Sequence, residues 1–184
     1  MAGIFFTADT HFGHGNIIKY CQRPFGSVRE MDGVIAENWN RIVNPTDLIF
    51  NLGDFSWLGA KQMQALLERL NGRKFLCIGS HDKRVSRLVG FFECIRESFL
   101  VEVGERQFVF FNHYLHKVWP KSHHGSLHLF GHSHGRMNAY AEQEGKLLDV
   151  GVDSHNFYPW SLDEVAAVMA IRPLNFNDLR KRPR

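Results

Sequence analysis

A chain of 184 residues is long enough to bury a full core, and its 44% hydrophobic and 22% charged residues are typical of a soluble globular protein. The net charge is +3, but the terminal stretch LRKRPR alone carries four basic residues, so the rest of the chain is close to neutral. This distribution argues against a broad basic surface that would bind nucleic-acid backbones.

The sequence also argues against a membrane or secreted protein. No apolar run approaches the roughly 20 residues of a membrane span, and the N-terminal stretch lacks the basic and apolar regions of a signal peptide. Cys21, Cys77 and Cys94 are an odd number without CxxC spacing, so neither a disulfide framework nor a zinc knuckle is indicated. We expect a cytoplasmic protein with no membrane partner, and its oligomeric state stays open.

Strands and helices alternate in the first half of the chain. Apolar runs predict buried strands over 3–9, 47–54 and 73–80. Helical spacing of apolar residues predicts helices between and after them, over 14–21, 27–43, 60–72 and about 83–89. Ser27 is expected to cap the second of these helices, and Gly72 is expected to end the third.

Strands dominate the second half. Residues 98–113, SFLVEVGERQFVFFNH, predict a hairpin that turns near Gly104. Three more strands are expected within 127–132 and 136–153, the last two joined near Gly145. A final helix over 161–171 opens with Ser-x-x-Glu, which is a capping-box signature.

This order of elements predicts an α/β fold in which two sheets pack together with helices outside. No repeat, low-complexity segment or linker interrupts the chain. We therefore expect one domain over 1–174, followed by a basic, flexible tail over 175–184.

Asp and His residues stand at the ends of five of the predicted strands, in TADTHFGH, NLGDF, IGSHD, FFNHY and LFGHSHG. They are Asp9, His11, Asp54, His81, Asp82, His113, His132 and His134. In extended backbone, residues two apart project to the same side, so the first and last stretches could each supply two ligands to one site. The preceding glycines, Gly53, Gly79 and Gly131, would let the backbone approach a ligand closely.

Mixed nitrogen and oxygen donors without a thiolate suit manganese, iron or zinc better than an all-oxygen magnesium or calcium site. There are more candidate ligands than one ion needs, which indicates two divalent ions that share a carboxylate, with manganese favoured. Such ions, about 3.5–4 Å apart, clamp a phosphate and generate a metal-bound hydroxide for in-line attack.

The ordered motifs D-x-H, G-D, G-x-H-D, H and G-H-x-H resemble those of the calcineurin-like metallophosphoesterases, and the similarity runs from position 9 to 134. The later stretch LDVGVD also resembles the end of small bacterial and phage members. The resemblance implies a metallophosphoesterase-type two-sheet β-sandwich flanked by helices (αββα). It also implies a metal-dependent phosphodiesterase or phosphatase.

Carried over by position, the family pattern implies a role for each motif residue. One metal would be held by Asp9, His11, Asp54 and His134, and the other by Asp54, Ser80, His113 and His132. Asp54 would bridge the two ions. His81 would protonate the leaving oxygen, and Asp82 would orient His81.

Ser80 departs from the family pattern, which usually has Asn at this position. A serine hydroxyl reaches less far than an amide oxygen, so we expect weaker binding of the second metal. A natural substitution and an engineered one are both open.

Three residues near the motifs are candidates for binding substrate: His14, Arg23 and His116. The remaining histidines of the stretch 113–128 are expected in a solvated loop. The expected substrate is a small phosphate ester or nucleotide-like molecule, either monoester or diester, and nucleic acid is less favoured. The alternative function is a catalytically weakened protein of the same fold that acts as an interaction module.

Overall fold

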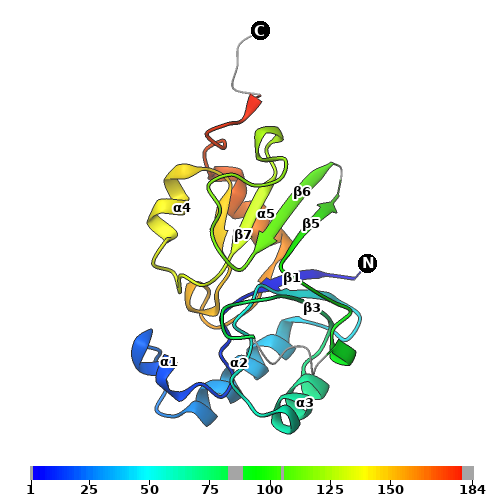
Figure 1. Ribbon diagram of the computed structural model, residues 1–184, viewed down its shortest axis with the longest axis vertical. Coiled ribbons are helices and arrows are strands. Elements are labelled where there is room, and N and C mark those ends of the chain that lie inside the picture. The colour runs from blue at the N-terminus through cyan, green and yellow to red at the C-terminus, as the bar shows by residue number, and fades with distance from the viewer. Residues whose placement is uncertain (1, 83–88, 105, 180–184) are drawn as a thin grey trace.

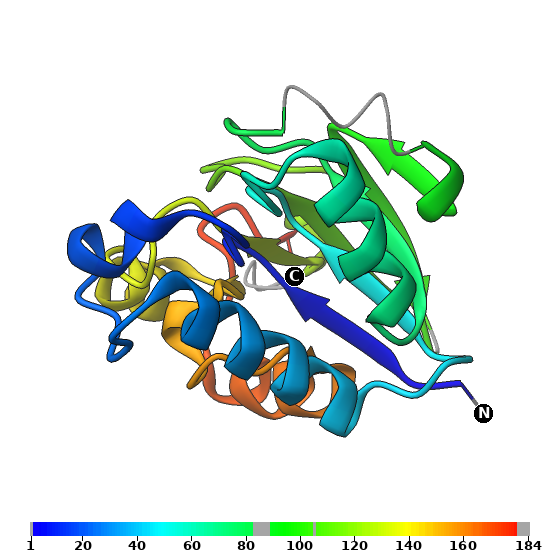
Figure 2. The ribbon, with the colours of Figure 1, turned by 90° about the horizontal axis from the view of Figure 1, so that it is seen from below.

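Two mostly parallel β-sheets pack face to face, and the helices lie on the outside (Figure 1 and Figure 2). The computed structural model describes residues 2–82, 89–104 and 106–179. The α-helices are α1 (Gly15–Tyr20), α2 (Val28–Ile42), α3 (Ala60–Arg69), α4 (Asn138–Glu144) and α5 (Leu162–Ile171). The α/β architecture predicted from the alternation of elements is therefore present.

The first sheet has the strand order β4-β3-β2-β1-β9. Its strands are β1 (Ile4–Thr7), β2 (Leu48–Asn51), β3 (Arg73–Cys77), β4 (Cys94–Arg96) and β9 (Trp160–Ser161). All neighbours are parallel except β1 and β9. Because β1, β2 and β3 run in the same direction, the loops that follow them leave from one edge of the sheet.

The second sheet has the order β5-β6-β7-β8. Its strands are β5 (Ser98–Val103), β6 (Gln107–Asn112), β7 (Leu127–Phe130) and β8 (Leu147–Asp149). β5 and β6 form the predicted antiparallel hairpin, with Val103 paired to Gln107 across the turn at Gly104, where φ is +58°. β6, β7 and β8 are parallel, so their loops also share one edge.

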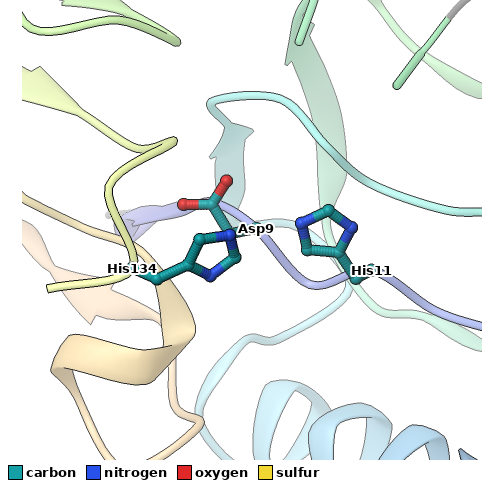
Figure 3. Close-up of side chains that lie close together, drawn as sticks. All are labelled: Asp9, His11 and His134. Atoms are coloured by element: carbon teal, nitrogen blue, oxygen red, sulfur yellow. The ribbon is translucent and has the colours of Figure 1, made fainter. Parts of the chain in front are cut away.

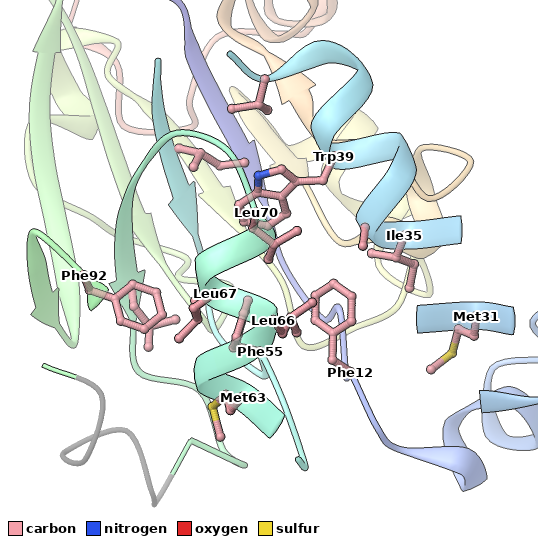
Figure 4. Packing of buried hydrophobic residues seen from close by; sticks show 14 of the residues in the cluster. Phe12, Met31, Ile35, Trp39, Phe55, Met63, Leu66, Leu67, Leu70 and Phe92 are labelled. Atoms are coloured by element: carbon pink, nitrogen blue, oxygen red, sulfur yellow. The ribbon is translucent and has the colours of Figure 1, made fainter. Parts of the chain in front are cut away.

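The alternation of side chains along each strand of the first sheet divides the core into layers. Ile49 and Leu76 point outward and pack in one cluster with residues of α2 and α3. Phe12, Trp39 of α2 and Leu67 of α3 belong to the same cluster (Figure 4). The strand residues adjacent to Ile49 and Leu76 point inward and fill the space between the sheets, where they contact side chains of the second sheet such as Phe111. α5 closes this inner layer beside β1 and β8. A third cluster lies between α4 and the outer face of the second sheet.

Both predicted N-caps are confirmed. The Ser27 hydroxyl accepts a hydrogen bond from the Glu30 N–H at 3.2 Å. Ser161 and Glu164 form the full capping box, in which the Glu164 carboxylate accepts from the Ser161 N–H at 2.8 Å. These bonds satisfy N–H groups that lack a partner within the first turn.

Two sequence predictions about elements are wrong. Residues 136–144 do not form a strand, because Asn138–Glu144 is helix α4. Met137, Tyr140 and Ala141 pack against the second sheet with the i, i+3, i+4 spacing of a helix, which outweighed the expectation of continued strands. Helix α3 also ends at Arg69 rather than at Gly72, which instead has a φ of +89° in the turn before β3.

Two further predictions lie partly or wholly outside the described residues. These are the short helix around 83–89, of which 83–88 are not described, and the last residues of the 175–184 tail, 180–184. In the described part of the chain, no helix combines the length and apolarity needed to cross a membrane.

Candidate metal centre

The candidate metal ligands gather where the loops after β1, β2, β3, β6 and β7 meet. Their backbone is unusual, because Asp9, His11, Asp54, His132 and His134 all have φ between +49° and +66°. Non-glycine residues rarely adopt this left-handed conformation, although Asp and His tolerate it better than most. Such residues concentrate at functional sites.

This conformation corrects the reasoning from the sequence. Asp9 and His11 are not in extended backbone, because β1 ends at Thr7 and both residues lie in a tightly turning loop. Strand alternation therefore does not explain why their side chains lie together. The same holds for His132 and His134 after β7. The pairs were predicted to supply two ligands each to one site. Asp9 and His11 do lie in one group of donor atoms, whereas His132 and His134 lie in two neighbouring groups, and turns rather than a pleat aim all four side chains.

Hydrogen bonds between two loops hold the turned backbone in place. The Asp9 N–H donates to the Gly53 carbonyl and the His11 N–H donates to the Asp54 carbonyl, both at 3.0 Å. Phe12 then pairs with Ser56 in an isolated parallel bridge. The loop after β1 is therefore fastened to the loop after β2 along the length of the ligand-bearing segment.

The first donor group consists of Asp9, His11 and His134, whose donor atoms lie within 4.8 Å of one another (Figure 3). The His134 Nδ1–H donates to Asp153 at 2.7 Å. This bond fixes the ring and leaves Nε2 available as a ligand, which is the usual arrangement of a metal-binding histidine.

The second donor group consists of Asp54, His113 and His132, again with donor atoms within 4.8 Å. The His113 Nδ1–H donates to the Leu52 carbonyl at 2.8 Å and so leaves Nε2 available. Asp54 also reaches the first group, because its Oδ1 is 3.6 Å from His113 Nε2 and its Oδ2 is 3.7 Å from His11 Nε2. This is the position expected of a bridging carboxylate.

Three donor atoms of these groups are buried and have no hydrogen-bond partner among the described residues: Asp9 Oδ1, His11 Nε2 and His113 Nε2. Unpaired buried polar atoms are costly, and native structures rarely leave them without a function. Imidazole nitrogens and carboxylate oxygens are donors that manganese, iron and zinc accept. The residues present therefore fit a pair of divalent ions.

Burial and neighbouring charge act on the protonation of the same donors. Burial, together with the carboxylates of Asp149, Asp54 and Asp153, raises the pKa of Asp9 well above 3.8. Burial, together with electrostatic repulsion from the neighbouring His134 and Arg23, lowers the pKa of His11 to about 2. His11 is thus neutral, as a ligand must be. Cations at this site would offset the crowding of carboxylates around Asp9.

Glycines are required at two close approaches. A Cβ atom at Gly79 would overlap the backbone nitrogen of Asp54, and one at Gly131 would lie 2.9 Å from the Asp9 carboxylate. The expectation that glycines before the ligands allow close packing is confirmed at these positions.

Ser80 and His81 reach the centre through Asp54. The Ser80 hydroxyl lies 3.0 Å and 3.2 Å from the two carboxylate oxygens of Asp54, to which it can donate. The His81 N–H donates to Asp54 Oδ1 at 2.8 Å, and its ring nitrogen Nε2 is 3.9 Å from Asp54 Oδ2. The His81 side chain is 43% exposed, so it stands between the buried donors and solvent.

Asp82 has a different role from the one expected. Its carboxylate accepts hydrogen bonds from the N–H groups of Gly79, Asp54 and Phe55, at 2.8–3.0 Å. These bonds tie the loop after β3 to the loop after β2. A carboxylate occupied by three backbone donors braces the ligand loops instead of orienting the His81 ring.

Two carboxylates that the sequence analysis did not single out complete the surroundings. Asp153 accepts from His134 and from both Nε and Nη2 of Arg23 at 2.7–2.8 Å. Asp149 is fully buried and accepts from Ser133 and from the N–H groups of Gly135 and Gly151. Both belong to the stretch LDVGVD, whose two acidic residues could have drawn attention to it.

Arg23 is not a surface residue that could bind substrate. Its side chain is fully buried, and besides Asp153 it donates to the carbonyl oxygens of Asp9 and Thr10 at 2.7 Å and 3.2 Å. Burial alone would raise the pKa of Asp153, but the hydrogen bonds from His134 and Arg23 hold it below 3.8. Arg23 therefore stabilises the ligand loop from behind.

An open cavity of about 790 Å³ lies over the donors, and its walls include Asp54, His81, His132 and His134. His14, one of the three candidates for binding substrate, also lines it. Among the described lining residues, neither Arg23 nor His116 is present. His116 packs against Phe110 and the buried ring of His128, which lies in β7 and not in the solvated loop expected for it.

The bracing role of Asp82 predicts a stability effect. We expect Asp82→Ala to lower the free energy of unfolding by about 3 kcal/mol, because three buried N–H groups lose their acceptor. Urea unfolding measures the change, and Asp163→Ala, on the exposed start of α5, is the control. Equal midpoints for the two variants would contradict the bracing role.

The buried pairing of Arg23 predicts a similar loss. Arg23→Met should destabilise the fold by about 3–5 kcal/mol, since it leaves the largely buried Asp153 carboxylate without its arginine partner and with His134 alone. The matched control is Arg73→Met, because Arg73 forms an exposed ion pair with Glu93. If Arg23→Met changed only the affinity for substrate and left the stability unchanged, Arg23 would have the substrate-binding role predicted from the sequence.

The comparisons with known proteins cover most of the chain. No protein-family model matches it. It is 26% identical over 183 residues to the gene 66 protein of Mycobacterium phage L5, covering 84% of this chain and 88% of that protein. The protein of unknown function AQ665 from Aquifex aeolicus shares the fold, with a TM-score of 0.74, 24% identity and coverage of 91% of this chain and 100% of that one.

A further relative is the uncharacterized protein MJ1445 of Methanocaldococcus jannaschii. The two sequences are 34% identical over 174 residues, which cover 92% of each chain. Identity at this level over nearly the full length of both proteins shows common descent. The chain therefore belongs to the same protein family as MJ1445.

Proposed function

We propose that this protein is a phosphoesterase that depends on two divalent metal ions. The observation that supports the proposal most strongly is that two three-residue donor groups lie next to each other and are joined by Asp54, with three of their donor atoms buried and unpaired among the described residues. The open cavity above them gives a phosphate ester access.

The proposal includes the type of fold. Two packed sheets with helices outside, and ligand loops at the carboxyl ends of parallel strands, are what a metallophosphoesterase-type αββα sandwich would require. The order of the motifs along the chain supports the same identification.

Asp9, His11, Asp54 and His134 would hold one ion, and Asp54, His113 and His132 the other, with manganese favoured over iron or zinc. Bound ions of this kind supply Lewis acidity toward the phosphate oxygens and lower the pKa of water. The protein's own contribution is to hold these donors rigidly, through the turned loops and the hydrogen bonds to His113 and His134.

His81 is the proposed general acid. It lies at the cavity wall, its backbone is tied to Asp54, and its ring is partly exposed. A histidine in this position can give a proton to the leaving oxygen of a phosphate ester when the bond to phosphorus breaks. Both monoesters and diesters have leaving oxygens that such a proton would stabilise.

An interaction module is the second candidate, and Ser80 is the observation that favours it. The Ser80 hydroxyl is engaged with Asp54, which the second ion would need. Retention of the other donors and of an accessible His81 favours the enzyme instead.

Activity and metal content test the proposed function together. With Mn²⁺, the protein should hydrolyse an aryl phosphodiester or its matched monoester, and a chelator should abolish turnover. His81→Ala should lower the rate by about 100-fold or more with metal content unchanged, whereas Asp54→Asn should lose metal as well as activity. Elemental analysis and a chromogenic assay measure both quantities.

Absence of bound metal together with absence of chelator-sensitive turnover on both esters would favour the interaction module. Turnover that persists in His81→Ala would remove only the role of His81.

Ser80 provides a separate prediction. Ser80→Asn should tighten the second metal site, because an amide oxygen reaches further than a hydroxyl and would no longer donate a hydroxyl proton to Asp54. Titration with Mn²⁺ should show the weaker of two binding steps moving to lower concentration. Unchanged stoichiometry, affinity and turnover would show that Ser80 does not limit the site.

A further inference from the structure

The cavity above the donors is also lined by residues that are not candidate metal ligands. They come from α1 and from the loop after β2, and they are Ile17, Tyr20 and Trp57, together with His14, which precedes α1. His14 lies next to the first donor group, because its Nδ1 is 3.4 Å from Nδ1 of His11. A phosphate ester with its phosphorus at the donor groups could therefore place the rest of the molecule against these side chains.

Trp57 is exposed although its surroundings are rigid. The indole-bearing residue is 49% exposed, whereas the preceding residues Phe55 and Ser56 are buried. The Trp57 N–H donates to the Phe12 carbonyl at 2.8 Å, and the Ser56 hydroxyl donates to the same oxygen at 3.1 Å. A large aromatic side chain held at a cavity wall by a fixed backbone is a ready surface for a ligand.

The rings beside Trp57 extend this surface. The His14 ring is stacked on Trp57, with centroids 4.3 Å apart and planes inclined by 20°. Tyr20, which is 64% exposed, meets His14 edge-on at 6.3 Å. Trp57 also lies 5.0 Å from the ring of His81, so the aromatic wall begins next to the proposed general acid.

Polar groups lie along the same wall. Asn16 and Arg136 line the cavity and are exposed, and Arg136 donates to the Tyr20 carbonyl at 3.2 Å. A purely aliphatic group would leave these donors unused. A flat ring with polar edges could stack on the aromatic side chains and accept hydrogen bonds at its rim.

We propose that Trp57, His14 and Tyr20 form a stacking subsite for a nucleobase, so that the substrate is a nucleotide phosphoester. The phosphate would lie at the donor groups and the base against the aromatic wall. The assignment of the phosphate rests on the proposed function, but the stacking subsite is a binding property that can be measured without turnover.

Adenosine 5′-monophosphate and ribose 5-phosphate are the probes, because they carry the same phosphate and sugar and differ in the base. Calorimetric titration of the full chain, with and without Mn²⁺, should show about tenfold tighter binding of the nucleotide. In Trp57→Leu the ratio of the two dissociation constants should fall to near one, and Trp57→Phe should restore most of it. Phe176→Leu, which removes an exposed aromatic ring that does not line the cavity, is the control.

A ratio near one in the unaltered protein would overturn the subsite. A ratio that Trp57→Leu leaves unchanged would also overturn it, because Trp57 would then only support His14 and His81. The two proposals fail separately: hydrolysis without a preference for the nucleotide removes the subsite and keeps the phosphoesterase. A preference for the nucleotide without metal-dependent hydrolysis removes the phosphoesterase and keeps the subsite.

Discussion

The left-handed backbone at the candidate metal ligands is the constraint on which the rest of the candidate site depends. Five donors have positive φ, and each would relax to a commoner conformation if its loop were free. The loops are not free, because the segment after β1 is hydrogen-bonded to the segment after β2, and Asp82 ties in the segment after β3. Strain of this kind persists only where the surrounding structure opposes relaxation.

Buried negative charge is the second organising feature. Asp9, Asp54 and Asp149 are buried within one small region, and Asp153 lies beside them. The fold neutralises these charges in different ways. Asp149, like Asp82 nearby, accepts hydrogen bonds from backbone N–H groups, and Asp153 forms an ion pair with Arg23. Asp9 and Asp54 retain oxygens that face the imidazole donors. Asp82, Asp149 and Asp153 each accept several hydrogen bonds and hold the loops, whereas Asp9 Oδ1 is unpaired among the described residues and Asp54 has histidine nitrogens on both sides. Asp9 and Asp54 are therefore the carboxylates placed to bind cations.

The sequence predicted the main elements and the location of the centre, and it failed in identifiable places. Apolar runs and caps placed β1, β2, β3, α2 and α5 correctly, because these signals are local. Helix α4 was missed, although Met137, Tyr140 and Ala141 have helical spacing. The strands predicted on either side of it suggested a further strand in between. The roles of Arg23 and His116 could not be found locally, because Arg23 pairs with a residue 130 positions away.

The sequence by itself determined which residue types end the strands, and therefore that imidazoles and carboxylates would gather where the strands end. In the structure these strand ends belong to both sheets. Only the tertiary structure decided which of these groups face one another and which brace the backbone. Asp54 and Asp82 have the same side chain and both follow a strand, yet Asp54 has histidine nitrogens of both donor groups beside it, and Asp82 accepts hydrogen bonds from three N–H groups. The reason is physical: burial, hydrogen-bond partners and loop crossings depend on segments far apart in the chain, which a local pattern does not contain.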